Sequence, residues 1–188
     1  MKILKLGLVS LAVSTALFAG TYNVDASHTN AGFTVKHMMI TNVTGKFNDV
    51  AGAFEFDEKT NTLKSINGEI VVASINTANE KRDEHLKAEE MFDVAKFPKI
   101  TFKSTKIEKD AVYGDFTMKG VTKNIKLDLE TSSVIKDPWG KQRTGFSLNG
   151  KIKRSDFGLT WNKALETGGV AVSDEVKLAI DIEGVLAQ

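Results

Sequence analysis

The stretch VAGAFEF, residues 50–56, alternates between two kinds of side chain. Successive side chains of a β-strand point to opposite faces, so one face carries Val50, Gly52, Phe54 and Phe56 and the other Ala51, Ala53 and Glu55. This alternation is typical of a strand with one face in a core. The face that holds both phenylalanines is expected to point inward.

The same two-residue period recurs along most of the 188 residues. Counting such segments, separated by Gly, Asn, Asp and Pro turns, predicts about eight long antiparallel strands and one short helix. We favour an extended, lipocalin-like barrel over a sandwich, because closing the sheet removes the exposed edges of such strands. Several candidate inward positions are Gly, Ala or Ser, which permits a long apolar cavity.

One segment departs from simple alternation. In GEIVVASINT, residues 68–77, Val71, Ala73 and Ile75 are expected on one face and Ile70, Val72 and Ser74 on the other. A strand that is apolar on both faces needs cover on its outer side. The helix or a second subunit would provide it, and a homodimer is therefore a possible assembly.

The first twenty residues, MKILKLGLVSLAVSTALFAG, have the composition of a secretory signal peptide. Lys2 and Lys5 precede a short apolar run, which ends at the small residues Ala19 and Gly20. The run is too short to span a bilayer comfortably, so we expect cleavage rather than an anchor, and no integral membrane span afterwards. Residues 21–188 then form a single domain.

Charge and cysteine content narrow the possible functions further. Removing residues 1–20 leaves 23 basic against 24 acidic residues, with no basic patch of the kind that binds nucleic acid. The chain has no cysteine, which excludes thiol catalysis and cysteine-ligated metal. An exported chain without disulfides suits a bacterial periplasm.

A polar helix interrupts the strands. Thr77 and Glu80 have the spacing of a capping box, and Pro98 prevents the helix from continuing into the next strand. We expect a helix over residues 78–90, with Asp83 paired to Lys87. Its apolar side is thin, so it suits a lid across one barrel end, with Met91 and Phe92 at the rim; a solvated connector is the alternative reading.

The three histidines, His28, His37 and His85, raise the question of a metal. Three histidines can hold a catalytic zinc, but a continuous strand between His28 and His37 would place them on opposite faces, and HExxH is absent. Histidines bonded to backbone or carboxylates at a barrel rim are the simpler reading. Alternatively they donate hydrogen bonds to a polar or anionic head group.

Nucleophile and phosphate motifs are not found. There is no GxSxG, and GVTK (residues 120–123) lacks a glycine-rich phosphate loop. RSDFGLTW (residues 154–161) reads either as a buried-edge ion pair with core aromatics or as an arginine that faces a cavity mouth.

Several segments together resemble the YceI-like family, which comprises secreted bacterial proteins with a lipocalin-like barrel that bind polyisoprenoids or related long-chain lipids. They are YNVDASHTNAGFTVKH, VTGKF, RDEHLKAEEMFDVAKFPKITF, GDFTMKGVTK, RSDFGLTW and VSDEVKLAIDIE, in the family's order. The chain departs from the pattern at Met91, where an aromatic is usual, and at Tyr22, where tryptophan is common; both changes are conservative.

The resemblance implies a cavity for a lipid such as an isoprenoid, quinone-like or fatty-acid-like molecule. For the head group we expect His28, His37, Arg82, His85 and Arg154, with Asp83 and Asp156 holding the arginines and Lys123 as a further candidate. For the tail we expect Phe33, Phe54, Phe92, Phe102, Phe116 and Leu127. No cofactor and no metal are implied.

The sequence therefore predicts a periplasmic, non-enzymatic protein that transports or sequesters such a lipid. Two alternatives stay open. One is a metal-dependent or acid–base enzyme that acts on a lipid head group through His28, His37 and His85. The other is a stress-related structural or interaction protein.

Overall fold

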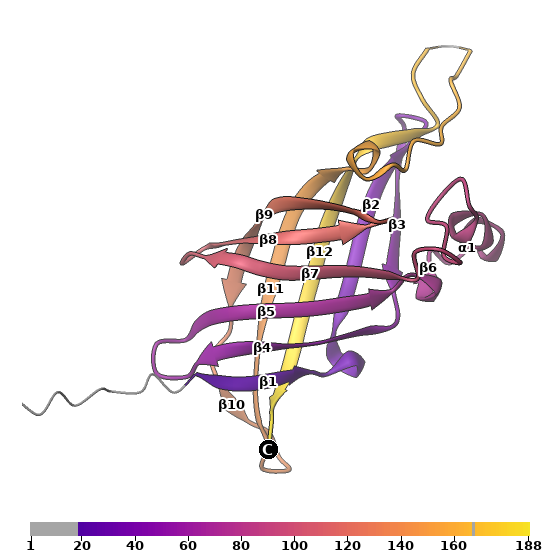
Figure 1. Ribbon diagram of the computed structural model, residues 1–188. Helices are drawn as coiled ribbons and strands as arrows, with labels where there is room; N and C mark the ends of the chain where they lie inside the picture. The colour runs from indigo at the N-terminus through magenta and orange to yellow at the C-terminus, as the bar shows by residue number, and fades with distance from the viewer. Residues whose placement is uncertain (1–18, 167) are drawn as a thin grey trace, which may run out of the picture.

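The computed structural model describes residues 19–166 and 168–188 (Figure 1). The predicted signal peptide lies outside this range apart from Ala19 and Gly20, and Gly20 begins the first strand. The strands are β1 (Gly20–Val24), β2 (Asn30–His37), β3 (Thr41–Phe47), β4 (Val50–Asp57), β5 (Thr62–Val71), β6 (Ile75–Asn76), β7 (Lys99–Ile107), β8 (Ala111–Met118), β9 (Val121–Thr131), β10 (Ile135–Lys136), β11 (Gln142–Lys153) and β12 (Val172–Leu186). The helices are α1 (Glu80–Lys87) and 3₁₀ turns at Ala26–His28, Val72–Ser74 and Arg154–Phe157. No helix in the described ranges has the length and apolar character needed to cross a membrane.

Eight strands close into an antiparallel barrel, which confirms the predicted fold class. The order around the ring is β11-β9-β8-β7-β5-β4-β1-β12, and β12 pairs with β11 to complete it. The 15-residue β12 is the longest strand. Its last residues pair with β1 and its first part pairs with β2, which carries β3 and β6 beyond the ring.

The barrel interior holds two apolar clusters, which follow each other along the strands. On β4, Val50 belongs to one cluster, whereas Phe54 and Phe56 belong to the other. β8 and β11 divide in the same way. The predicted inward face of residues 50–56 is confirmed, since Val50, Phe54 and Phe56 are buried while Ala51 and Glu55 are exposed.

Aromatic rings fill one end of the barrel, around Tyr22 of β1. The Phe54 ring stacks on Tyr22 with centroids 5.4 Å apart and meets the edge of Phe146 at 5.0 Å. Tyr22 also contacts Phe56. A Cβ atom on Gly184 would lie 2.4 Å from the Phe54 ring, so only glycine leaves room for it there. We call this end the closed end.

The predicted doubly apolar strand over residues 68–77 is wrong in detail. β5 ends at Val71, and the 3₁₀ turn Val72–Ser74 rotates the chain so that Val72 and Ile75 are both buried, at 1% and 4% exposure. The break in period 2 thus buries one residue from each expected face within the same chain, whereas Ala73 is exposed. This segment therefore needs no second subunit to cover it.

The helix is shorter than expected and begins differently. Asn79, not Thr77, is the N-cap, and its side chain accepts a hydrogen bond from the Arg82 backbone N–H at 3.0 Å. Lys87 pairs with Glu84 at 3.0 Å rather than with Asp83, whose carboxylate instead accepts the backbone N–H and hydroxyl of Thr77. Figure 1 shows α1 beside the barrel end opposite the closed end.

Candidate functional site

A cavity of about 280 Å³ lies inside the barrel beneath α1. Its walls come from β2, β3, β5, β7, β8, β11 and β12, from α1 and the segments on either side of it, and from the loop before β12. Most lining side chains are aliphatic or aromatic, and the ionisable ones are His37, Arg82, His85 and Arg154. Such a volume is close to the lower bound, about 300 Å³, of pockets that take small organic ligands.

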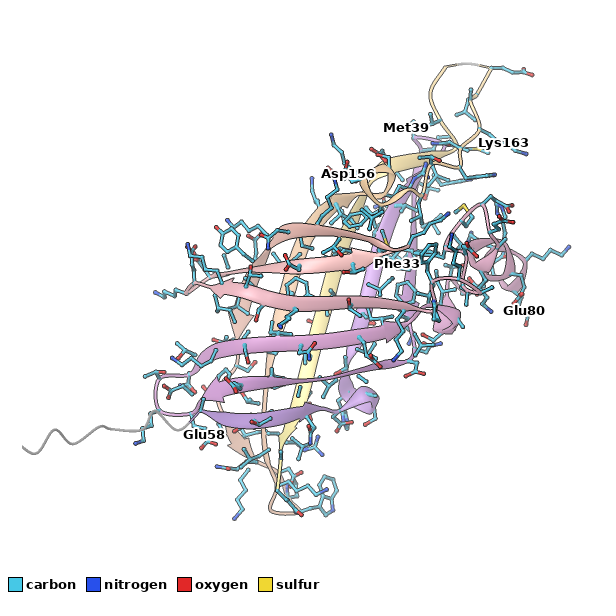
Figure 2. All side chains as sticks on the ribbon, viewed as in Figure 1. Phe33, Met39, Glu58, Glu80, Asp156 and Lys163 are labelled. Atoms are coloured by element: carbon cyan, nitrogen blue, oxygen red, sulfur yellow. The ribbon has the colours of Figure 1, made fainter. Side chains whose placement is uncertain are left out.

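Phe33 forms part of one wall (Figure 2). On the neighbouring strand Gly45 stands directly opposite it, and a Cβ there would lie 2.4 Å from the Phe33 ring. The glycine thus lets the ring lie flat along β3. Phe33 contacts Phe47 at 5.7 Å between centroids, and Phe47 contacts Phe92 at 6.1 Å, which links β2 to the segment after α1.

A second hollow of about 70 Å³ continues from the first toward the closed end. Phe102, Leu127 and Phe146 help to line it. Both hollows share a group of lining residues that marks the junction between them: Ala31, Ile70, Ile100, Phe116, Leu178 and Ile180. A slender apolar chain that passed this junction would stop at the aromatic cluster of the closed end.

The structure places the predicted tail residues as follows. Phe33 and Phe92 line the larger cavity, Phe102 and Leu127 line the smaller hollow, and Phe116 lines both. Phe54 lines neither, because its ring is packed within the closed end. Axial position along the barrel, which alternation alone does not reveal, separates Phe54 from the others.

Four of the predicted head-group residues line the larger cavity: His37, Arg82, His85 and Arg154. Arg82 donates from Nε and Nη2 to the Thr77 hydroxyl and carbonyl, at 2.7 and 2.8 Å. His85 lies 3.1 Å from Glu90 through Nε2 and edge-on to the Trp161 ring, with centroids 4.9 Å apart. The His85–Trp161 contact joins α1 to the loop before β12 across the cavity.

Arg154 is only 7% exposed. Its guanidinium donates to the backbone carbonyls of Leu159, Trp161 and Ser173 at 2.6–3.0 Å, with a longer contact to Val172. Burial lowers the pKa of Arg154 from its ordinary value. The arrangement ties the loop before β12 to the barrel, and these carbonyls, not Asp156, hold the guanidinium.

The other four predicted head-group residues lie outside the larger cavity. Asp83 holds Thr77, as described above. Lys123 and Asp156 are exposed and border a shallow outer hollow with Asp174. His28 lies in the 3₁₀ turn between β1 and β2 and is also exposed.

The three histidines do not form one site. His28 precedes and His37 ends β2, whose eight residues span about 25 Å at roughly 3.3 Å per residue. Only His37 and His85 line the cavity. The shared three-histidine centre considered from the sequence is therefore not formed.

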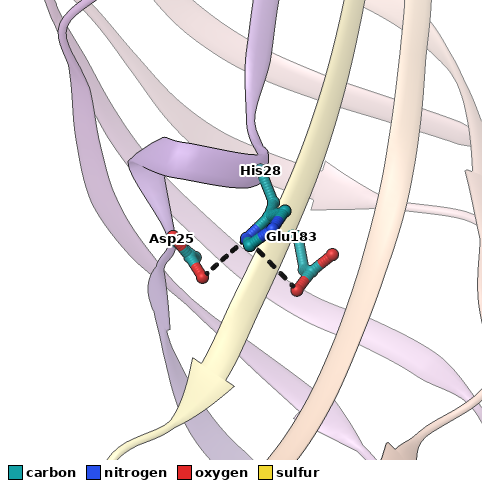
Figure 3. A group of neighbouring side chains, drawn as sticks. All are labelled: Asp25, His28 and Glu183. Carbon is teal, nitrogen blue, oxygen red and sulfur yellow. Dashed lines mark hydrogen bonds and ion pairs between the residues drawn. The ribbon is translucent and has the colours of Figure 1, made fainter. Parts of the chain in front are cut away.

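His28 instead belongs to a charged cluster on the barrel surface (Figure 3). Its Nδ1 lies 3.0 Å from Asp25 Oδ2 and 4.0 Å from Glu183 Oε1, a grouping that could in principle hold a cation. However, Arg143 Nη1 donates to the same two oxygens, at 2.7 and 2.6 Å. Arg143 Nε also binds Asp137, at 2.8 Å. The guanidinium thus already supplies the positive charge that the carboxylates need.

This cluster makes stability depend on pH. Hydrogen bonds from Ser27, Arg143 and His28 lower the pKa of Asp25, and the bond from Arg143 lowers that of Asp137. A carboxyl with a depressed folded-state pKa stabilises the fold above its unfolded pKa, about 3.9, and that contribution is lost as the pH falls toward the folded value.

We predict that Arg143→Met lowers the melting temperature at pH 7. The difference in melting temperature between the variant and wild type should become smaller as the pH falls from 4 to 2. Melting curves across that range test it, with Lys141→Met as an exposed control that should leave the pH profile unchanged. A gap that stays constant down to pH 2 would contradict the assignment of the depressed pKa values to Arg143.

Comparison with known proteins identifies the family. The family model described as the YceI-like domain matches residues 22–184, nearly the whole described chain. The chain belongs to the YceI-like family.

Two relatives support this assignment at the level of sequence. A UPF0312 protein of Yersinia enterocolitica is 36% identical over 193 residues, covering 96% of this chain and 97% of the relative. The crystal structure of a Campylobacter jejuni YCEI protein superposes with a TM-score of 0.69 at 38% identity, covering 81% and 90% of the two chains. YceI-like sequence and fold thus agree over most of the molecule.

A more distant YceI-like fold is a domain from Saccharophagus degradans, described as polyisoprenoid-binding and implicated in plant cell wall breakdown. It has a TM-score of 0.66 at 16% identity, covering 88% of this chain and 98% of the domain. At this identity the similarity concerns the fold.

Sequence reasoning missed part of the YceI-like cavity. Trp161 and Leu159 come from the loop before β12, and Val35, Phe47 and Ile152 come from strands. Val35 has the same parity as Phe33, and Phe47 and Ile152 lie on the apolar sides of alternating segments, so alternation could have found them. The loop residues had no such signal, because Arg154 positions them through backbone carbonyls.

Proposed function

We propose that the protein binds a long-chain isoprenoid or a similar amphiphilic lipid, with the tail in the cavity and the polar head at the α1 end. The observation that carries this proposal is the apolar cavity of about 280 Å³ inside a barrel whose other end is filled by aromatic rings. Enclosing an apolar chain away from water contributes about 0.8 kcal/mol per methylene. A few buried methylenes therefore supply useful affinity before the costs of ordering the ligand.

The two hollows define a path for the tail. The larger takes the first part of the chain, and the smaller hollow of about 70 Å³ takes its tip when side chains at the junction move aside. Ile100 and Phe116 line both hollows. The small combined volume favours a single slender chain over a bulky ring system.

The head group is expected beside α1, where polar groups meet the cavity. His37, Arg82 and His85 provide the donors. Within the described residues His37 has no side-chain hydrogen bond, and Arg82 uses Nε and Nη2 but not Nη1. These groups suit a hydroxyl, carbonyl or anionic head.

Membership of the YceI-like family supports the same conclusion, and a domain of this fold is described as polyisoprenoid-binding. Binding needs no reacting group, so we propose a non-enzymatic carrier or sequestering protein. The N-terminal sequence supports export to the periplasm, where a free isoprenoid tail would need such shelter from water.

Native mass spectrometry of the protein purified without detergent tests the proposal. We expect a fraction of the protein to carry one long-chain lipid, recoverable by organic extraction and absent after delipidation. Delipidated protein should then take up a single equivalent of an added polyprenol. Purified and delipidated protein that binds neither polyprenols nor fatty acids would contradict the proposed function.

A further inference from the structure

The turn between β2 and β3 exposes three consecutive apolar side chains. Met38, Met39 and Ile40 are 42%, 58% and 79% exposed. Large exposed apolar side chains next to one another are unusual on a soluble surface and commonly mark an interaction site. We call these three residues the apolar tip.

The backbone of the tip does not favour these residues. Met38 and Met39 have φ values of +49° and +60°, and the Ile40 N–H donates to the His37 carbonyl at 2.9 Å. Two central residues with positive φ characterise type I′ turns, where Asn-Gly is the preferred pair. Methionine at both positions is disfavoured by the backbone, and neither side chain is buried in return. Hairpin stability therefore does not explain these side chains.

The apolar tip stands at the rim of the cavity. His37, immediately before it, lines the cavity, and the Met38 N–H donates to the carbonyl of Ala171, which lines it as well. Figure 2 shows Met39 and Lys163 at the same end of the molecule, where the loop before β12 projects beyond the turn that carries Met39. Ala171 donates in turn to the Lys163 carbonyl, so tip and loop form one continuous rim.

We propose that the apolar tip inserts into the surface layer of a lipid bilayer and sets the cavity mouth against it. This inference rests on the proposed function, because a lipid carrier has to collect a tail that is dissolved in a membrane. Flexible methionines and an isoleucine suit the disordered boundary between head groups and acyl chains. A tail can then pass from bilayer to cavity without crossing water.

The charges beside the tip are mixed. Lys36 and Lys163 are basic, and Glu166 in the same loop is acidic. Insertion is therefore driven mainly by the apolar side chains, and the interaction should depend weakly on salt.

The molecule supplies its own matched control. Ile135 and Trp139 are 60% and 82% exposed, but Ile135 begins β10 and Trp139 lies in the β10–β11 turn, far from α1 in Figure 1. They do not line the cavity. Ile135→Thr with Trp139→Ser removes a comparable exposed apolar surface without touching the rim.

The experiment compares three proteins: wild type, the tip variant Met38→Asn/Met39→Gly/Ile40→Thr, and the control variant. Asn-Gly fits the turn, so the tip variant should fold at least as well as wild type. The first measurement is flotation with vesicles of phosphatidylethanolamine and phosphatidylglycerol. The second is the rate at which dansyl-tagged farnesol moves from those vesicles to the protein. The third is loading with the same probe from detergent, which needs no membrane.

We expect the tip variant to lose vesicle binding and transfer rate by about tenfold or more, as removal of three inserted apolar groups implies, while it loads normally from detergent. The control variant should behave as wild type throughout. Unchanged transfer in the tip variant, or an equal loss in the control, would overturn the inference. So would a tip variant that changes the oligomeric mass in light scattering, since the tip would then join two copies of the chain. Failure of wild type to load from detergent would instead reject the proposed function, while flotation would still report on the tip.

Discussion

The Ala31→Phe variant is expected to bind lipid at least tenfold more weakly than wild type while remaining folded. Ala31 is 3% exposed and lines both hollows, so its side chain points to the junction through which a tail must pass. A phenyl ring there occupies the tail's path. Excluding two or three methylenes costs about 2 kcal/mol of binding free energy, or roughly thirtyfold in affinity.

Ala179→Phe is the control for this variant. Ala179 lies on β12 beside Gly32, the residue after Ala31, but its side chain is exposed on the outer face of the barrel. The two variants add the same ring to neighbouring strands on opposite sides of the wall. Polyprenol titration, followed by native mass spectrometry, should show weaker binding by Ala31→Phe and wild-type binding by Ala179→Phe. Equal affinities would mean that the cavity near Ala31 holds no ligand.

Arg154→Met is expected to lower the free energy of unfolding by about 3–5 kcal/mol, because buried carbonyls of the loop before β12 and of β12 itself would lose their donor. For a chain of this size each kcal/mol corresponds to roughly 2–4 °C, so the melting temperature should fall by about 10 °C. Methionine preserves much of the side-chain length but donates no hydrogen bond. Thermal and urea denaturation measure the loss.

Lys153→Met tests whether the effect is specific, since Lys153 is adjacent but exposed. It should change the melting temperature little. If Arg154→Met keeps wild-type stability but binds lipid weakly, the guanidinium contacts the head group instead of holding the loop. Arg154 would then have the role that the sequence first assigned to it.

Much of the fold could be predicted because the alternation of apolar and polar residues shows which face of each strand is buried. Residues 50–56 show this: Phe54 and Phe56 point inward as expected. Alternation does not record how far along the barrel axis a residue lies, since that depends on the pairing of distant strands. Phe54 was therefore placed beside the tail, whereas its pairing with β1 puts it in the aromatic cluster.

The candidate site was less predictable because its polar residues interact with backbone atoms. Every residue has a backbone carbonyl, so the sequence does not show which carbonyls accept hydrogen bonds from Arg154. The helix N-cap was misplaced for a related reason: Thr77 has the right side chain, but Asp83 binds it. The separation of His28 from His37, by contrast, was expected from their odd spacing, which places them on opposite faces of a strand, and in the structure the length of β2 keeps them apart as well.

The packed aromatic cluster of Tyr22, Phe54 and Phe146 closes the barrel at one end, so its cavity has a single opening rather than running through the molecule. A lipid bound as proposed enters tail first and must leave through the same opening. Its polar end faces the opening throughout, so the lipid is released in the same orientation in which it was taken up. A second lipid cannot enter until the first has left.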